Sequence, residues 1–231
     1  MIVCGSPVNL LPTLLVMFAL SAVLMATLAL AYRAPASAAF RIKEDPTRKV
    51  VGLRLYARVF ANMLLSAVLV TTMSVTGEQV LVHAGSDAWW IVVGHTVLII
   101  TLYDFLYYFM HRFAFHQTSW LKKVHTVHHL VRHPTALDAL FLHPVETTLG
   151  LLLLFSCIAI VGPVSLLAFG IVITTHSLVN IIVHSGLDLP FFGLRTGGYL
   201  ARKHDLHHTS MRGGNFSSII PLWDVWFGTA E

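Results

Sequence analysis

The sequence predicts an all-α fold: a polytopic membrane helical bundle of four to five spans with a histidine-rich helical cap on its cytoplasmic side. Three observations predict it, namely long apolar segments, one-sided basic residues and a recurring histidine pattern. Hydrophobic residues make up 56% of the 231 residues and charged residues only 11%, whereas about a quarter of the residues in a soluble domain are charged. One membrane bundle is therefore expected.

Five stretches are apolar and long enough to cross a hydrocarbon core about 30 Å thick, which takes roughly 20 helical residues. They run from Asn9 to Tyr32, Leu55 to Val75, Trp89 to Met110, Pro144 to Gly162 and Pro163 to His184. The last two are joined by "VGP", which indicates a tight hairpin, and four crossings with a re-entrant hairpin are the alternative. No basic residue precedes the first apolar run, so a retained span is expected rather than a cleaved signal peptide.

The basic residues predict the orientation of these spans. Seven of the 15 lysines and arginines lie within residues 33–58, four within 112–132 and four within 195–212. All of them fall on one side of a five-span alternation, and the positive-inside rule makes that side cytoplasmic. Because these charges are tied to membrane ends and form no basic face on a soluble fold, no nucleic-acid partner is expected.

The histidine pattern H-x-x-H-H occurs twice, at 125–129 and at 204–208. Positions i, i+3 and i+4 share one face of a helix, so each triplet can wrap a metal ion. Upstream, "HRFAFH" places His111 and His116 where the third span ends, and the two can converge if the helix ends or bends between them. The last span ends in "NIIVHSG", which places Asn180 and His184 one helical turn apart.

Nine histidines are candidate metal ligands at the cytoplasmic side. They are His111, His116, His125, His128, His129, His184, His204, His207 and His208. Zinc sites close with four ligands, so nine imidazoles predict two ions with four or five ligands each. Imidazole suits iron, zinc, copper and nickel. We interpret His83 and His95 as polar groups with backbone partners, whereas His176, inside a span, is open between a functional and a structural role.

The motifs "HRFAFH", "HTVHH" and "HDLHH", in this order between hydrophobic hairpins, resemble the integral-membrane fatty acid hydroxylase superfamily, which includes sterol desaturases and carotenoid hydroxylases. "HPVE" and "GGNFSSIIPLWDVWFGT" support the resemblance, which begins near Asp104. It divides the chain into N-terminal membrane spans with a cytoplasmic linker, residues 1–103, and a catalytic region of the fatty acid hydroxylase type, residues 104–231.

The resemblance implies two iron ions that activate dioxygen to hydroxylate or desaturate a lipid such as a sterol or a fatty acyl chain. The nine histidines would be the ligands, and zinc could replace iron in purified protein. This chain departs from the pattern at Asn180, where some members carry another histidine. That coordination position would be filled by water, by His143 or by nothing.

Several other polar residues are candidates for the site. Metal-bound imidazoles usually donate their second N–H to a carboxylate or carbonyl. Asp104, two turns before His111, is therefore a candidate catalytic-site residue together with Asn180, and a structural role for Asp104 is the alternative. Asp138, Asp205 and Asp224 are further candidates for such hydrogen bonds. Glu146 is expected instead to be an acid in a first helical turn, where the helix dipole favours it.

The chain shows no cytochrome, flavin or iron–sulfur motif, so electrons are expected from a separate donor of the ferredoxin or cytochrome type. Four basic residues near the histidines, Lys122, Lys123, Arg202 and Lys203, are expected to be exposed and could dock an acidic donor, although membrane anchoring is the favoured interpretation of each. The substrate would enter from the bilayer. The lipid, the product and the oligomeric state are left open by the sequence.

The main alternative is a membrane protein that uses histidines for haem or for metal transport. Bis-histidine haem would pair histidines across spans near mid-membrane, and a transporter would place ligands along a pathway, whereas these histidines crowd at one face. A zinc hydrolase would need only three ligands and a carboxylate base. Cys4 and Cys157 lie beside or within apolar segments, so neither a disulfide framework nor a thiolate site is predicted.

Overall fold

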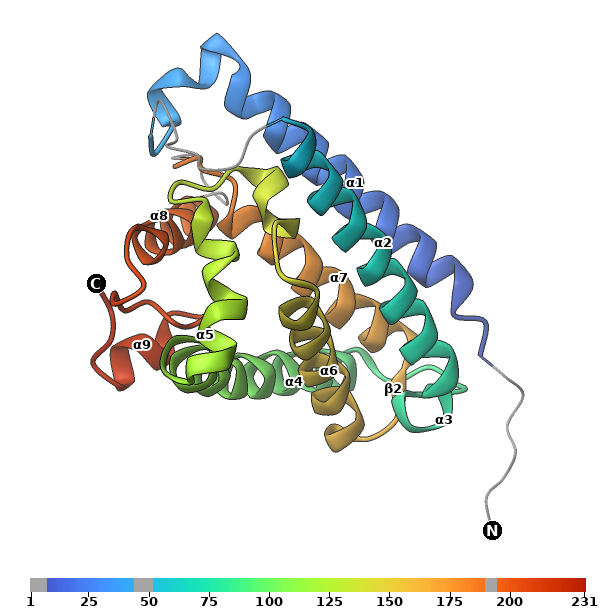
Figure 1. Cartoon of the computed structure of the whole chain (residues 1–231). Coiled ribbons are helices and arrows are strands. Elements are labelled where there is room, and N and C mark those ends of the chain that lie inside the picture. Colours follow the sequence, from blue (N-terminus) through green and yellow to red (C-terminus); the bar gives the residue numbers. More distant parts are fainter. Residues whose placement is uncertain (1–7, 44–51, 190–194) are drawn as a thin grey trace.

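The computed structural model describes residues 8–43, 52–189 and 195–231. Within them, five helices are long and apolar enough to cross a membrane (Figure 1). These are α1 (Leu11–Arg33), α2 (Leu53–Thr76), α4 (Trp89–Phe109, continued to Phe115), α6 (Pro144–Val161) and α7 (Leu166–Val183). Each lies within a few residues of its predicted stretch, so the predicted all-α, multi-span fold is confirmed.

The connection between α6 and α7 explains why two 18-residue spans can follow each other so closely. An 18-residue helix is about 27 Å long, close to the hydrocarbon thickness. Gly162, with φ +106°, ends α6 in a conformation that side chains disfavour. The chain then adds the strand β2 (Val164–Ser165), which pairs in parallel with β1 (Val82–His83) before α7 begins.

The spans pack in a continuous series. Helix α1 packs against α7, α7 against α4, α4 against α6, and α6 against α2. Ile99, Ile158 and Phe169 are fully buried at these contacts. A Cβ at Gly170 would lie 2.8 Å from the Thr13 methyl group, so this glycine permits the close approach of α7 to α1. Large apolar side chains elsewhere on the spans are exposed, as expected for surfaces that face lipid.

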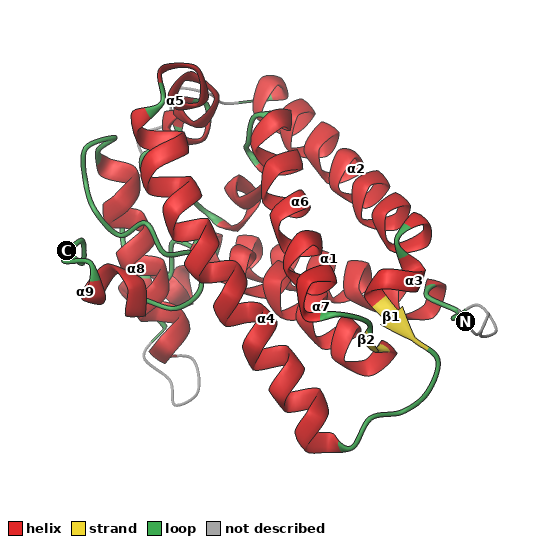
Figure 2. Cartoon of the chain, turned by 90° about the horizontal axis from the view of Figure 1, so that it is seen from below, coloured by secondary structure: helices red, strands yellow, loops and turns green. Residues whose placement is uncertain are grey.

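Short helices collect at the two ends of the bundle. One end carries α5 (Ser119–Thr126), α8 (Arg195–Thr209), α9 (Leu222–Trp226) and the 3-10 helices His128–Leu130 and Ala136–Leu140. The 3-10 helix Pro35–Phe40 follows α1. The other end carries α3 (Glu78–Leu81) and the strand pair (Figures 1 and 2). The histidine-rich helical cap is therefore present, and its cytoplasmic placement stays a prediction.

Candidate metal centre

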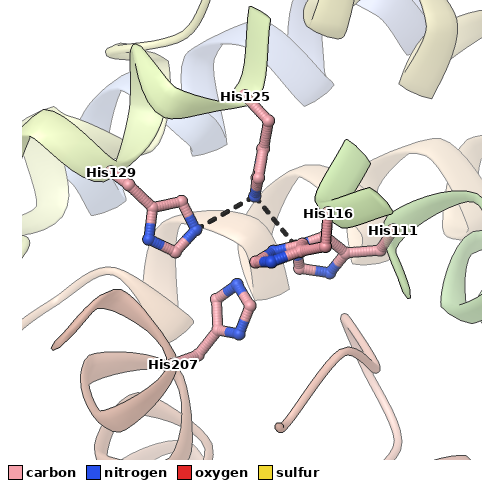
Figure 3. A group of neighbouring side chains, drawn as sticks. All are labelled: His111, His116, His125, His129 and His207. Carbon is pink, nitrogen blue, oxygen red and sulfur yellow. Dashed lines mark hydrogen bonds between the residues drawn. The ribbon is translucent and has the colours of Figure 1, made fainter. Parts of the chain in front are cut away.

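The structure brings all nine predicted histidines together in two groups. Within each group, the candidate ligand nitrogens lie within 4.8 Å of one another. The five-histidine group consists of His111, His116, His125, His129 and His207. The four-histidine group consists of His128, His184, His204 and His208. All are buried except His204, which is partly exposed. Figure 3 shows the five rings of the first group turned toward a common centre.

A local change in helix geometry brings His111 and His116 together. Residues Met110–Phe115 continue α4 as a π-helix, in which hydrogen bonds join residues five apart rather than four. Positions i and i+5 therefore share a face, and the two ring centroids lie 5.0 Å apart. The two histidines were expected to converge if the helix ends or bends between them, and the wider π-helical turn is the local change that brings them together.

Each H-x-x-H-H triplet is divided between the two groups, which corrects the expectation that one triplet can wrap one ion. In the second copy, His204 and His208 lie in the four-histidine group and His207 in the other. Adjacent helical residues point about 100° apart, because an α-helix has 3.6 residues per turn. His207 and His208 therefore face different centres, as do His128 and His129 in the first copy.

Seven of the nine rings have the orientation of their Nδ1 atom fixed by a hydrogen bond to an oxygen. The acceptors are the carbonyl oxygens of Phe216 for His111 (2.8 Å), Met211 for His116 (3.0 Å), Phe141 for His128 (3.2 Å), Asn180 for His184 (2.7 Å), Gly214 for His207 (2.7 Å) and Val131 for His208 (2.7 Å), and the Glu146 carboxylate for His125 (2.7 Å). A carbonyl only accepts, so Nδ1 carries the proton and Nε2 keeps a lone pair.

The Nε2 atoms face one another, and in the seven rings whose Nδ1 carries the proton the Nε2 atom has none. Those of His111 and His125 lie 3.1 Å apart, and that of His128 lies 3.1 Å from those of His184 and His208. The Nε2 atoms of His116 and His207 are buried without a hydrogen-bond partner in the described part of the chain. Converging lone pairs repel unless a cation lies between them, so both groups fit metal ions.

Burial keeps these rings in the protonation state that binds metal. It lowers the pKa of His125 and of His128 to about 3 and that of His116 to about 4. Histidine must be neutral to coordinate, and these rings are neutral at physiological pH. The site therefore does not depend on a metal ion to displace protons from its ligands.

Glu146 has a role that the sequence analysis did not favour. It does lie in the first turn of α6, as expected. Its Oε1 atom also accepts a hydrogen bond from His125 Nδ1 at 2.7 Å, and both side chains are buried. A carboxylate in this position orients the ring and increases its basicity toward a metal.

The C-terminal segment 211–217 forms one wall of the five-histidine group, because its carbonyls accept from His111, His116 and His207. Asp224 holds this wall by accepting hydrogen bonds from the backbone N–H groups of Phe216 and Ser217. Lys203 Nζ lies 2.6 Å from Asp224 in a buried ion pair. Lys203 was expected to be exposed for donor docking, and that expectation is wrong.

Asp104 holds the backbone segment that directly follows this wall. Its fully buried carboxylate accepts hydrogen bonds from three consecutive backbone N–H groups, those of Ser218, Ile219 and Ile220, at 2.7 to 3.0 Å. These contacts place Asp104 against the C-terminal chain that follows Phe216, the acceptor for His111. It therefore acts on the site through the backbone.

The other candidate residues take separate positions. Asn180 provides its backbone carbonyl to His184, and His143 caps α6 by accepting from Val145 N–H. Neither His143 nor His176 belongs to the two groups, and His176 Nε2 is hydrogen-bonded to the Tyr103 hydroxyl at 2.9 Å.

The remaining acidic candidates are bound to nearby groups. Asp138 caps its 3-10 helix through Thr135, and Asp205 accepts from His133 at 3.0 Å. His83 and His95 lie beside the Asp87 carboxylate, and not on backbone partners as expected.

A family profile described as fatty acid hydroxylase matches residues 96–229, a range that includes all nine histidines. The chain belongs to the fatty acid hydroxylase family. The family resemblance recognised in the histidine motifs is thus confirmed, and the five apolar helices make this member a multi-pass membrane protein.

Three relatives illustrate what this fatty acid hydroxylase family member is similar to. Methylsterol monooxygenase 1 of Rattus norvegicus is 33% identical over 147 residues, which cover 61% of this chain and 48% of the relative. The Gallus gallus protein of the same name is 31% identical over 144 residues, with 61% and 47% covered. A very-long-chain aldehyde decarbonylase of Oryza sativa subsp. indica is 34% identical over 151 residues, with 61% and 53% covered. The chain spans about half the length of these relatives, and no solved structure matches it.

Proposed function

We propose that this chain is a membrane-bound di-iron oxygenase that hydroxylates or desaturates a lipid with dioxygen and electrons from a separate donor. The observation that carries the proposal is the pair of histidine groups in which seven Nδ1 atoms are hydrogen-bonded to oxygens, so that Nε2 lone pairs converge on two centres. Family membership and the methylsterol monooxygenase relatives support lipid oxidation.

In this proposal, iron supplies the dioxygen chemistry needed to break an unactivated C–H bond, which acid–base side chains cannot do. The five-histidine group would hold one ion and the four-histidine group the other. The chain's own contribution is to keep the rings neutral, to fix their orientation and to exclude water by burial. Glu146 orients His125, and Asp104 and Asp224 hold the wall that orients His111 and His207.

The same arrangement favours an oxygenase over the haem alternative. Facing Nε2 atoms of His128 and His208 lie only 3.1 Å apart, which leaves no room for a porphyrin plane between axial ligands. The nine rings form two compact groups and do not mark a pathway along the spans. This placement disfavours the transport alternative.

We further propose that the histidine end faces the cytoplasm and receives electrons there. All lysines and arginines lie on that side of the five-span alternation. Lys122 and Lys123 are exposed on α5, the helix that carries His125, so an acidic ferredoxin or cytochrome could dock close to a ligand. Arg202 is exposed but paired with Asp188, so it contributes less to such a surface.

The proposed activity is tested by expressing the chain with a redox donor under ¹⁸O₂ and comparing lipid extracts with those of a His128→Ala variant. A lipid that gains labelled oxygen or a double bond only with the intact chain supports the proposal. Identical extracts from both chains, with a competent donor and candidate lipids present, would count against it.

A further inference from the structure

The end of the bundle opposite the histidines contains a cavity of about 680 Å³. It is lined by the start of α1, the first half of α7 and the loop 85–87 that joins β1 to α4. Val16, Leu167 and Ile171 form apolar walls, and Asp87 and Ser165 add polar groups. Size and lining are typical of a small-molecule site.

Two buried polar atoms of the cavity lining, and a third on the neighbouring helix α4, make no hydrogen bond within the described part of the chain. They are Asp87 Oδ2, Ser165 Oγ and His95 Nδ1. Asp87 Oδ2 lies 3.7 Å from His95 Nδ1, and the Ser165 residue is only 1% exposed. Buried polar groups are normally paired, because an unpaired one loses its hydrogen bonds to water without replacing them. The Asp87 carboxylate can only accept hydrogen bonds, and Ser165 Oγ can accept one as well, so a ligand that donates fits this place.

The charge at this place narrows the class of ligand. Burial raises the pKa of Asp87, but the nearby Ser165 and His83 outweigh burial and hold that pKa below its ordinary value. The carboxylate is therefore ionised at neutral pH and favours a cation. A primary ammonium carries one positive charge and three N–H donors, which match an accepting carboxylate and hydroxyl. A choline group has the charge without donors, and a hydroxyl has one donor without the charge.

The position of the cavity relative to the bilayer further restricts the class of ligand. Trp89 and Trp90 lie two and three residues after Asp87 and are 73% and 61% exposed, as expected for aromatic residues at a membrane interface. The lining continues along α7 from Leu166 to Thr175, which corresponds to about 13 Å of helix. A ligand here would have its polar group at the interface and its apolar part among the spans.

We propose that this cavity binds a membrane lipid with a primary-amine headgroup. Its ammonium group contacts Asp87 and Ser165, and an acyl chain lies along α7 beside Val16 and Ile171. The site is at the opposite end of α7 from His184, so it is separate from the histidine groups and does not depend on the proposed oxygenase activity.

The test uses the full chain, exchanged into vesicles with equal amounts of phosphatidylethanolamine, phosphatidylcholine, phosphatidylglycerol and a sterol, and measures retained lipid after repurification. Phosphatidylethanolamine should be enriched over phosphatidylcholine, and Asp87→Asn should reduce the enrichment about tenfold. Glu78→Gln, which changes an acid at the same end outside the cavity lining, should retain it. Ile171→Trp should fill the cavity and remove the enrichment of phosphatidylethanolamine.

Three outcomes would overturn the proposal, provided that the variants elute as folded protein. Equal retention of the amine and choline lipids by the unmodified chain is the first. An Asp87→Asn variant that keeps the full preference is the second. Enrichment of the anionic lipid over phosphatidylethanolamine is the third, because the charge of the ligand would then be wrong.

Discussion

Replacing Glu146 by glutamine should weaken metal binding by the five-histidine group alone. Glutamine has nearly the same shape as glutamate, so His125 keeps a neighbour but loses the charged acceptor that lies 2.7 Å from its Nδ1. Substitution of such a partner typically costs 10- to 100-fold in metal affinity, which is about 1.4 to 3 kcal/mol. The four-histidine group has its Nδ1 contacts on backbone carbonyls and should be unaffected.

Chelator competition on reconstituted protein measures this difference. Bound metal should fall in two steps, with the first ion lost at a 10- to 100-fold lower chelator concentration than in the unmodified chain. Glu78→Gln is the matched control, because Glu78 accepts its hydrogen bond from Val8 at the other end of the bundle. Unchanged affinities, or equal weakening of both ions, would refute the reasoning that Glu146 acts through His125.

Three other perturbations have definite expected outcomes. Asp104→Asn places an amide group against three backbone N–H donors and should lower the free energy of unfolding by about 1–3 kcal/mol. Hydrogen exchange in the C-terminal segment should become faster, and unchanged exchange would contradict this expectation. Lys203→Met leaves the buried Asp224 without its cation and should destabilise the protein by about 3–5 kcal/mol, so an unchanged unfolding midpoint would refute it. The pKa of His125 and of His128 is about 3 when folded and about 6.5 when unfolded. Below pH 6.5 the unfolded chain therefore binds more protons, and metal-free protein should melt at a lower temperature at pH 5 than at pH 7.5; equal melting temperatures would contradict this.

The spans and the identity of the clustered histidines could be predicted from the sequence because each has a strong local signal. Apolar runs fix the helices, and the spacing of His204, His207 and His208 fixes their place on one helix. The assignment of rings to the two groups could not be predicted, because it depends on the 100° between adjacent residues and on the facing elements. It also depends on the π-helix at Met110–Phe115, which has no simple sequence signature.

The supporting hydrogen bonds were harder to predict for a related reason. Backbone carbonyls such as those of Gly214 and Phe216 exist at every position, so sequence alone cannot select which ones face the rings. Glu146 has two simultaneous roles, at a helix start and on His125, and the first masks the second. Lys203 resembles other basic residues near a membrane end until Asp224, 21 positions later in the sequence, is placed beside it.

The central claim is that two histidine groups each hold one metal ion, and metal content per folded chain tests it most directly. Protein reconstituted with iron, freed of loosely bound metal and quantified by elemental analysis should contain two ions per chain. One ion or fewer per properly folded chain would contradict this claim.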